Sequence, residues 1–352
     1  MMPIREERSG TRRGRELRQT VTAALALAVA LFFLPLLAVR GEPLYTPEGA
    51  DAPPQEGKGS PAVQETAAAK DRGRIVRLQM EDGQVEELTM EEYLWGVVAA
   101  EMPASFEEEA LKAQACAART YTVTCQNSAS PKHSGADLCA DSTCCQAYIR
   151  REDAQARWGL DAGTYTEKIQ RAVAGTDGLG VLYEGEPIQA LFFSSAAGRT
   201  VDAVEVWGNA VDYLKSVDSP EGDEVPNYRT QEVLTAGQVK ELTLAAYPGA
   251  DLSGDPSGWF GQASRNQGGG VISIPLGGVT LTGSQVRSLF SLRSATFTVS
   301  WDGSAFTFDV TGYGHGVGMS QYGANAMAKE GKTFDEILTW YYTGTQVAPL
   351  WE

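Results

Sequence analysis

The clearest pattern of apolar and polar positions predicts two consecutive helices in the first half of the chain. Thr89 and Glu92 have the spacing of a capping box, so the first helix should begin near Met90. Pro103 cannot extend this helix, and the residue before a proline leaves the helical region, so the helix should end near Met102. The pattern therefore predicts a short helix with defined ends.

The second predicted helix begins at another capping box, formed by Ser105 and Glu108, and runs to about Thr124. Lys112 and Arg119 lie on one face of this helix, with small residues between them. Such a face can present two cations to a polar or anionic ligand. Alternatively, both cations are solvated and the two helices form a plain helical hairpin.

Glu101 lies at the end of the first predicted helix, in line with Leu94, Val97 and Val98. These positions follow the i, i+3, i+4, i+7 spacing, so the carboxyl group continues an apolar face. Loss of hydration on such a face raises the pKa of a carboxyl group toward the range that suits a general acid. The alternative is that Glu101 caps the N-terminus of the next helix.

Alternating residues predict strands on both sides of this helical pair. Residues 74–80 and 83–90 alternate like a hairpin, and residues 296–312 form a second hairpin around the turn Asp302-Gly303. Further strands are expected within residues 179–195, and residues 248–270 should form an irregular Gly-rich stretch. Further helices are expected at 165–176, 235–247 and 283–292, from Ser320, and from the capping box Thr333–Glu336. These patterns indicate an α+β protein with mixed helices and mostly antiparallel strands.

An apolar run at residues 21–39 precedes this folded part. At ~1.5 Å per helical residue the run spans roughly 30 Å, the thickness of the hydrocarbon core of a bilayer. Six arginines in residues 1–20 indicate that this tail is cytoplasmic and that the rest of the chain is exported. We expect an uncleaved single-pass anchor; a cleaved signal peptide is the alternative.

Residues 40–72 are rich in Pro, Gly, Ala and charged residues and have no periodicity, which predicts a flexible linker. The folded domain should then comprise residues 73–352. Its composition is acidic, with a formal net charge of −16 for the whole chain. This charge argues against nucleic acid as a partner, because nucleic-acid binding requires a basic surface.

All five cysteines lie between Cys116 and Cys145, and the segment that follows the second helix holds the donor set of a structural zinc site. The set comprises His133, Cys139, Cys144 and Cys145. The spacing is irregular, and adjacent cysteines rarely both reach one metal without strain. A disulfide from Cys139 to Cys144 or to Cys145 therefore remains the alternative.

His315 is one of only two histidines in the chain, and four glycines within residues 312–318 surround it, which leaves the imidazole approachable. The loop lacks the lysine and spacing of a phosphate-binding motif. The chain contains neither a G-x-S-x-G nucleophile elbow nor an H-E-x-x-H zinc helix. Trp207 and Tyr213 are candidates for stacking on sugars, although core packing is the more ordinary role of an aromatic residue.

Three long runs of residues resemble stage II sporulation protein D and its amidase-enhancer relatives. They read GVVAAEMPASFEEEALKAQACAARTY, VWG…YLKSVDSP and GYGHGVGMSQYGANAMAKEGKTFDEIL, and the resemblance covers roughly residues 73–347. The resemblance implies a lytic transglycosylase that binds peptidoglycan glycan strands in a groove and cuts them while the forespore is engulfed.

The same resemblance implies a location and partners. Family members are single-pass proteins of the mother-cell membrane, with the catalytic domain in the space between the mother-cell and forespore membranes. They act with stage II sporulation proteins P (SpoIIP) and M (SpoIIM). Protein P is an amidase and endopeptidase that strips the stem peptides, so the strands that protein D cuts are denuded.

The catalytic acid of the family is the Glu of an E-M-P motif, which corresponds to Glu101. Some members bind zinc through His and Cys residues that match His133, Cys139 and Cys145, and Cys144 stands where they have a histidine. Such an enzyme needs one acid, which first protonates the glycosidic oxygen and then takes the proton of the muramoyl 6-hydroxyl as the 1,6-anhydro ring closes. No cofactor is expected to take part in this chemistry.

Position and chemistry, not family precedent, suggest the substrate contacts. Lys112 and Arg119 are expected to hold the lactyl carboxylate of a peptide-free muramic acid. Tyr213, Tyr313, His315 and Gln321 are expected to line the groove. Two other functions remain open, namely a non-catalytic glycan-binding enhancer of an amidase and a structural membrane scaffold.

Overall fold

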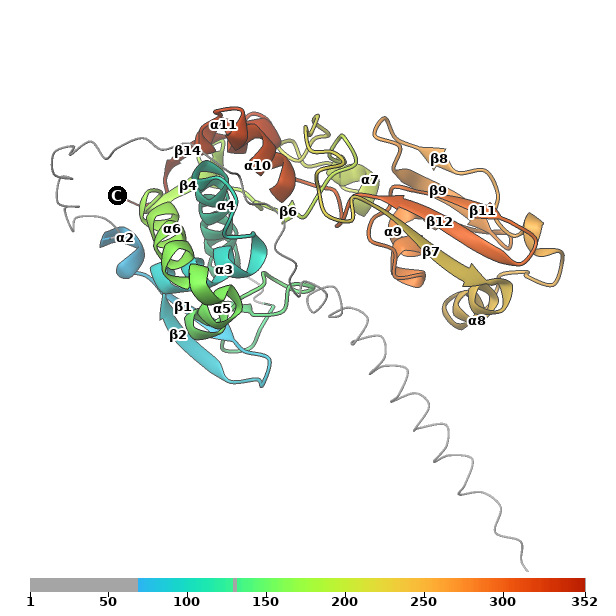
Figure 1. Ribbon diagram of the computed structural model, residues 1–352, viewed down its shortest axis with the longest axis horizontal. Coiled ribbons are helices and arrows are strands. Elements are labelled where there is room, and N and C mark those ends of the chain that lie inside the picture. The colour runs from blue at the N-terminus through green and yellow to red at the C-terminus, as the bar shows by residue number, and fades with distance from the viewer. Residues whose placement is uncertain (1–68, 129–131, 352) are drawn as a thin grey trace, which may run out of the picture. The chain divides into compact units, whose positions relative to one another are not determined.

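The computed structural model describes residues 69–128 and 132–351 and confirms the α+β class (Figure 1). The described residues form small sheets of two or three strands, and most strand pairs are antiparallel. Parallel pairing occurs between β1 (Ile75–Gln79) and β3 (Leu138–Cys139), and between β6 (Phe192–Phe193) and β13 (Met319–Ser320).

A helical core surrounds α4 (Glu108–Gln126). Alanines occupy many of the buried positions of α4, so neighbouring elements can approach its backbone closely. The elements that contact α4 are α3 (Met90–Glu101), α6 (Ala162–Ala174), α10 (Gln321–Lys329), α11 (Phe334–Tyr341), β4 (Leu179–Tyr183) and β5 (Glu186–Pro187). Segments from both ends of the described chain therefore meet at one helix.

The remaining elements of this core are short. The first hairpin pairs β1 with β2 (Val85–Thr89), as predicted, and β14 (Gln346–Pro349) pairs with β4. Three helices complete it: α2 (Ala69–Arg72), α5 (Arg151–Trp158) and α7 (Ala203–Trp207). The sequence patterns did not predict α5 and α7, because both are too short to show a clear period.

A second hydrophobic core lies between residues 234 and 310. Its central sheet has the strand order β11 (Phe297–Trp301), β12 (Ala305–Thr311) and β7 (Arg229–Thr235). The side chains of Phe297, Phe306 and Phe308 on this sheet are buried in the core. The second sheet and the helices of this core are β8 (Ser264–Arg265), β9 (Val271–Leu276), β10 (Val279–Thr282), α8 (Ala236–Ala246) and α9 (Gly283–Leu289). The predicted hairpin turn at Asp302-Gly303 is confirmed, with Gly303 at a φ of 99°.

Two of the three predicted capping boxes are confirmed, and one is wrong. Thr89 caps α3 and Thr333 caps α11. The helix α4 begins at Glu108, without a side-chain cap from Ser105. Its N-cap residue is Glu107, whose amide donates a hydrogen bond of 2.8 Å to the Oδ1 atom of Asn325 on α10. A residue distant in the sequence thus replaces the expected local cap.

The folded part begins earlier than expected, because residues 69–72 form α2 and Asp71 is fully buried. Asp71 Oδ2 lies 2.6 Å from Nη2 of Arg119, whose side chain is also fully buried. A buried guanidinium requires a charged partner, which explains why this end of the predicted linker is ordered. No helix among the described residues has the length and apolar character needed to span a membrane. The predicted anchor at 21–39 lies outside the described residues.

Candidate active site

Glu101 is the last residue of α3, which ends where the chain turns extended before Pro103. Its side chain is half-buried. Oε1 accepts a hydrogen bond of 2.7 Å from the backbone amide of Ala147, and Oε2 accepts one of 3.1 Å from Nε2 of Gln321. Segments far apart in the sequence thus hold the two oxygens of one carboxyl group.

Burial raises the pKa of Glu101, because loss of hydration disfavours the charged carboxylate. The hydrogen bonds from Ala147 and Gln321 act in the opposite direction and lower the pKa, but the net shift is upward. Among the described residues no other carboxylate contacts Glu101. The site therefore contains one carboxyl group that retains its proton to higher pH than an exposed glutamate, as a general acid requires.

Gln321 is the first residue of α10 and is buried. The helix N-cap, Ser320, accepts a hydrogen bond from the amide of Gly323 and donates one to Glu221. Glu221 is itself buried and also accepts a hydrogen bond of 2.6 Å from the amide of Ala196. These contacts fix the start of α10 and, with it, the amide group that faces Glu101.

His315 is held as a neutral imidazole. Its Nδ1 accepts a hydrogen bond of 3.2 Å from the amide of Val317, so its Nε2 carries the proton and donates to the carbonyl of Phe192 at 3.1 Å. Burial, together with the nearby charge of Arg287, lowers the pKa of His315 to about 4. With both ring nitrogens occupied, His315 orders the glycine-rich loop and has no nitrogen available for proton transfer.

The aromatic rings of Phe193 and Trp207 pack against His315. Trp207 is 49% exposed, and its ring centroid lies 5.8 Å from that of His315. Tyr313 exchanges backbone hydrogen bonds with Ser195. Tyr213 packs its ring 5.5 Å from that of Tyr183. No described contact joins Trp207, Tyr213 or Tyr313 directly to Glu101.

The structure gives Lys112 and Arg119 roles other than the expected ligand contacts. Arg119 has no exposed surface and is bound to Asp71, Thr176 and the carbonyl of Leu179. Its guanidinium therefore cannot reach a substrate. Lys112 Nζ lies 2.7 Å from Oε1 of Glu109 on the same helix, so an acidic residue already neutralises it.

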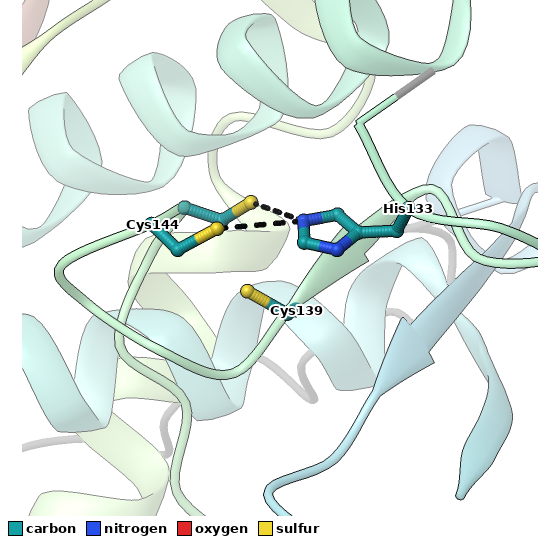
Figure 2. A group of neighbouring side chains, drawn as sticks. His133, Cys139 and Cys144 are labelled. Atoms are coloured by element: carbon teal, nitrogen blue, oxygen red, sulfur yellow. Dashed lines mark hydrogen bonds between the residues drawn. The ribbon is translucent and has the colours of Figure 1, made fainter. Parts of the chain in front are cut away.

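The predicted metal ligands do converge. The donor atoms of His133, Cys139, Cys144 and Cys145 all lie within 4.8 Å of one another (Figure 2). His133 Nε2 is 3.2 Å from Sγ of Cys145 and 3.6 Å from Sγ of Cys144. Ligand atoms of a tetrahedral zinc ion are about 3.5–3.8 Å apart, so the four donors fit such an ion with small adjustments.

None of the five cysteines, all of which lie in described segments, forms a disulfide. Short local contacts make the close approach of Cys144 and Cys145 possible. The amides of both residues donate to the carbonyl of Asp141, at 3.0 and 2.8 Å, and this turn directs both thiols toward His133. The tight turn therefore allows both adjacent cysteines to contribute to one group of candidate metal ligands.

Residues 133–146, which we call the cysteine loop, lead directly to the residue that contacts Glu101. After Cys145, Gln146 is buried and donates hydrogen bonds to the hydroxyl of Tyr93 on α3 and to Thr122 on α4. The next residue is Ala147, whose amide binds Glu101. The cysteine loop thus ends at the backbone group that positions the acid.

Sequence reasoning did not identify three groups near this site. The amide of Ala147 could not be found, because a backbone donor has no signature in the sequence. Arg287 and Arg293 were not distinguished from other arginines, because their surroundings depend on how the second core packs. Both are half-buried.

The chain is similar to several known proteins. The SpoIID family, described as stage II sporulation protein, matches residues 79–183, which include Glu101 and the cysteine loop. The chain is 42% identical over 268 residues to stage II sporulation protein D of Bacillus subtilis (strain 168), covering 75% of this chain and 76% of that protein. It is 40% identical over 266 residues to stage II sporulation protein D of Bacillus amyloliquefaciens, covering 75% of each. An amidase enhancer of Bacillus subtilis (strain 168) is 28% identical over 302 residues, covering 72% of this chain and 40% of that protein.

Proposed function

The chain belongs to the stage II sporulation protein D family, and we propose that it is a lytic transglycosylase that cuts peptidoglycan glycan strands during sporulation. The observation that carries this proposal is the environment of Glu101, a single half-buried carboxyl group with a raised pKa. Hydrolytic glycosidases generally require two carboxyl groups beside the scissile bond, one of which activates or replaces water. A lytic transglycosylase needs only one, because a hydroxyl of the substrate is the nucleophile.

In the proposed reaction, protonated Glu101 donates its proton to the glycosidic oxygen between N-acetylmuramic acid and N-acetylglucosamine, and the bond from that oxygen to C1 breaks. The resulting carboxylate accepts the proton of the muramoyl 6-hydroxyl. The 6-oxygen then bonds to C1, which closes the 1,6-anhydro ring and restores protonated Glu101. Gln321 and Ala147 hold the carboxyl group in place through both steps.

The proposed setting follows from the family and the amino-terminal sequence. Residues 21–39 anchor the chain in the mother-cell membrane, residues 1–20 remain in the cytoplasm, and residues 40–68 link the anchor to the folded domain. The domain then acts on denuded strands between the two membranes, together with the amidase SpoIIP and the membrane protein SpoIIM.

A structural zinc ion is part of the proposal. His133, Cys139, Cys144 and Cys145 provide one imidazole and three thiolates, a common ligand set for structural zinc. The ion supplies a cross-link within the cysteine loop and no catalytic chemistry. By ordering this loop, it supports the position of Ala147.

The similarity to an amidase enhancer favours a second candidate function. In that case the chain binds glycan without cutting it and accelerates the removal of stem peptides by a partner amidase. The products distinguish the two functions. A transglycosylase releases 1,6-anhydro ends from peptide-free strands, whereas an enhancer leaves those strands intact.

The decisive test is Glu101→Gln, which keeps the size of the side chain and removes its acidity. We expect release of 1,6-anhydro products from peptide-free strands to fall by about 10²–10⁴-fold, the usual contribution of a general acid. Binding of the strands should persist. Mass spectrometry of the products measures the first effect and co-sedimentation with glycan measures the second.

Glu107→Gln is the matched control, because this exposed glutamate lies in the same turn and its side chain should not contact the scissile bond. It should retain activity. If Glu101→Gln cuts strands at the unmodified rate, Glu101 is not the catalytic acid. If the unmodified chain leaves peptide-free strands intact, the enhancer function is the better one.

A further inference from the structure

Two arginines near the site have no acidic partner. Arg287 lies on α9 and Arg293 in the loop between α9 and β11, and Nε of Arg287 donates a hydrogen bond of 3.2 Å to the carbonyl of Arg293. Both side chains are half-buried. Within the described ranges, no aspartate or glutamate forms an ion pair with either of them.

The guanidinium group of Arg293 has unused hydrogen-bonding capacity. Its Cζ lies 3.9 Å from the centroid of the Tyr313 ring, in a cation–π contact that uses none of the five N–H donors. Its Nε is shielded from solvent and has no acceptor within the described part of the chain. Native proteins seldom leave buried donors unpaired, so this pattern suggests an acceptor supplied by a ligand.

Hydration of the two guanidinium groups is incomplete, because both side chains are half-buried. Burial lowers the pKa of both arginines, which means that their surroundings disfavour the positive charge. In a chain with a formal net charge of −16, acidic partners are plentiful, yet none is placed here. The cost of two poorly solvated cations is offset if an anion binds between them.

A chain of contacts links Arg293 to the turn that follows Glu101. The charge of Arg293 lowers the pKa of the Tyr322 hydroxyl against the effect of burial, so the two groups are neighbours. The Tyr322 ring packs edge-on against Phe106, with centroids 4.9 Å apart, in the turn that follows Glu101. Tyr322 also directly follows Gln321, which binds Glu101.

We propose that Arg287 and Arg293 form an anion subsite that binds the free lactyl carboxylate of muramic acid in peptide-free glycan. This inference rests on the proposed function, since it names the group of the substrate that the site reads. In this proposal Arg287 and Arg293 bind the lactyl carboxylate that the sequence predicted Lys112 and Arg119 to hold.

The chemistry explains a preference for denuded strands. A guanidinium binds a carboxylate through two parallel hydrogen bonds. In a strand that carries stem peptides the lactyl group is an amide, which has no charge and bears a bulky chain. The subsite therefore favours strands from which an amidase has already removed the peptides.

The test measures binding to two forms of one oligosaccharide. The first is a peptide-free oligomer of alternating N-acetylglucosamine and N-acetylmuramic acid with free lactyl carboxylates, and the second has these groups converted to methylamides. Calorimetry on the full chain carrying Glu101→Gln, which prevents cleavage, should give about tenfold tighter binding of the free acid at low salt, the order of magnitude of one charge-assisted contact. High salt should reduce this preference.

Arg293→Gln and Arg287→Gln, each added to Glu101→Gln, should bind both oligosaccharides with similar affinity. Arg157→Gln, which removes the same charge from an exposed position on α5, should keep the tenfold preference. Arg293→Lys preserves the charge and should retain part of the preference for the free acid. Thermal melting of each variant shows whether it is folded. If the glutamine variants are unfolded, the comparison of the two oligosaccharides on the parent chain tests whether the free carboxylate is preferred.

Equal affinity of the parent for the two oligosaccharides, or a preference that survives both arginine substitutions, overturns the inference. Absence of binding to either form also overturns it. The assay requires no cleavage, so it fails separately from the proposed activity. If the chain prefers the free acid but releases no anhydro product, the subsite is supported and the amidase-enhancer function is favoured. If the chain cuts strands but shows no preference for the free acid, only the subsite is overturned.

Discussion

The carboxyl group of Glu101 receives one hydrogen bond from a backbone amide and one from a side chain, and only the second can be removed by substitution. Because the Gln321 amide donates to the carboxylate, it stabilises the charged form and lowers the pKa of Glu101. Burial raises that pKa by more. The balance between the two effects sets the pH at which the acid loses its proton.

Gln321→Leu removes the donor while keeping the size of the side chain. The pKa of Glu101 should rise further, so the alkaline limb of the pH profile of kcat/KM should move to higher pH. Maximal activity should fall by about tenfold, since the lost hydrogen bond also orients the carboxyl group. The measurement is release of anhydro products as a function of pH.

Gln84→Leu serves as the control, because Gln84 is exposed in the turn between β1 and β2. Its pH profile should match that of the unmodified chain. An alkaline limb that stays in place in Gln321→Leu, or moves to lower pH, contradicts the assignment of that limb to Glu101.

At the scale of elements, the cysteine loop connects the metal ligands to the acid. The loop pairs with β1 through β3, and Gln146 attaches its far end to α3 and α4. The intervening residues form few regular hydrogen bonds, so a bound ion would supply most of their order. The ligand set has donor types that suit zinc, and its donor atoms fit a tetrahedral ion with small adjustments.

We expect about one equivalent of zinc per purified chain, and chelation should lower the Tm by more than about 5 °C, because binding free energy contributes directly to folding. Elemental analysis and thermal melting measure these effects independently of activity. His133→Ala should lose the ion. Cys116→Ala should keep it, since Cys116 lies apart from the cluster, with its thiol against the carbonyl of Leu179. A chain without zinc whose Tm is insensitive to chelators contradicts the metal site.

At the scale of the whole molecule, the folded domain is fixed at its start as well as in its cores. Asp71 on α2 pairs with Arg119 at the centre of the helical core. Only about thirty residues separate this point from the predicted membrane span, so a linker of that length restricts how far the active site can move from the membrane. With the proposed anchor and activity, we expect the chain to act on strands close to the bilayer.

The full chain should sediment with membranes and resist extraction at alkaline pH. A chain that begins at residue 41 should remain in the soluble fraction and keep its activity on peptide-free strands. The native amino terminus can be read by mass spectrometry. A terminus near residue 41 in the native protein would show that the apolar run is a cleaved signal peptide and would contradict the anchor.

The sequence by itself determined the features that arise from neighbouring residues. The capping boxes at Thr89 and Thr333 and the turn at Gly303 are confirmed, because side chains or a glycine a few residues away produce them. The helical period predicted that Glu101 loses part of its hydration, and Glu101 is half-buried at the end of α3. Likewise, the cysteine ligands lie within a short segment and could be recognised together.

Tertiary structure alone decided which charges are available. The period of α4 placed Arg119 on a face, but Asp71, distant in the sequence, determines that this face is closed to ligands. Arg293 became notable only because packing left its Nε donor buried without an acceptor. The physical reason is that periodicity specifies the direction of a side chain, whereas its charge partners depend on what packs opposite it.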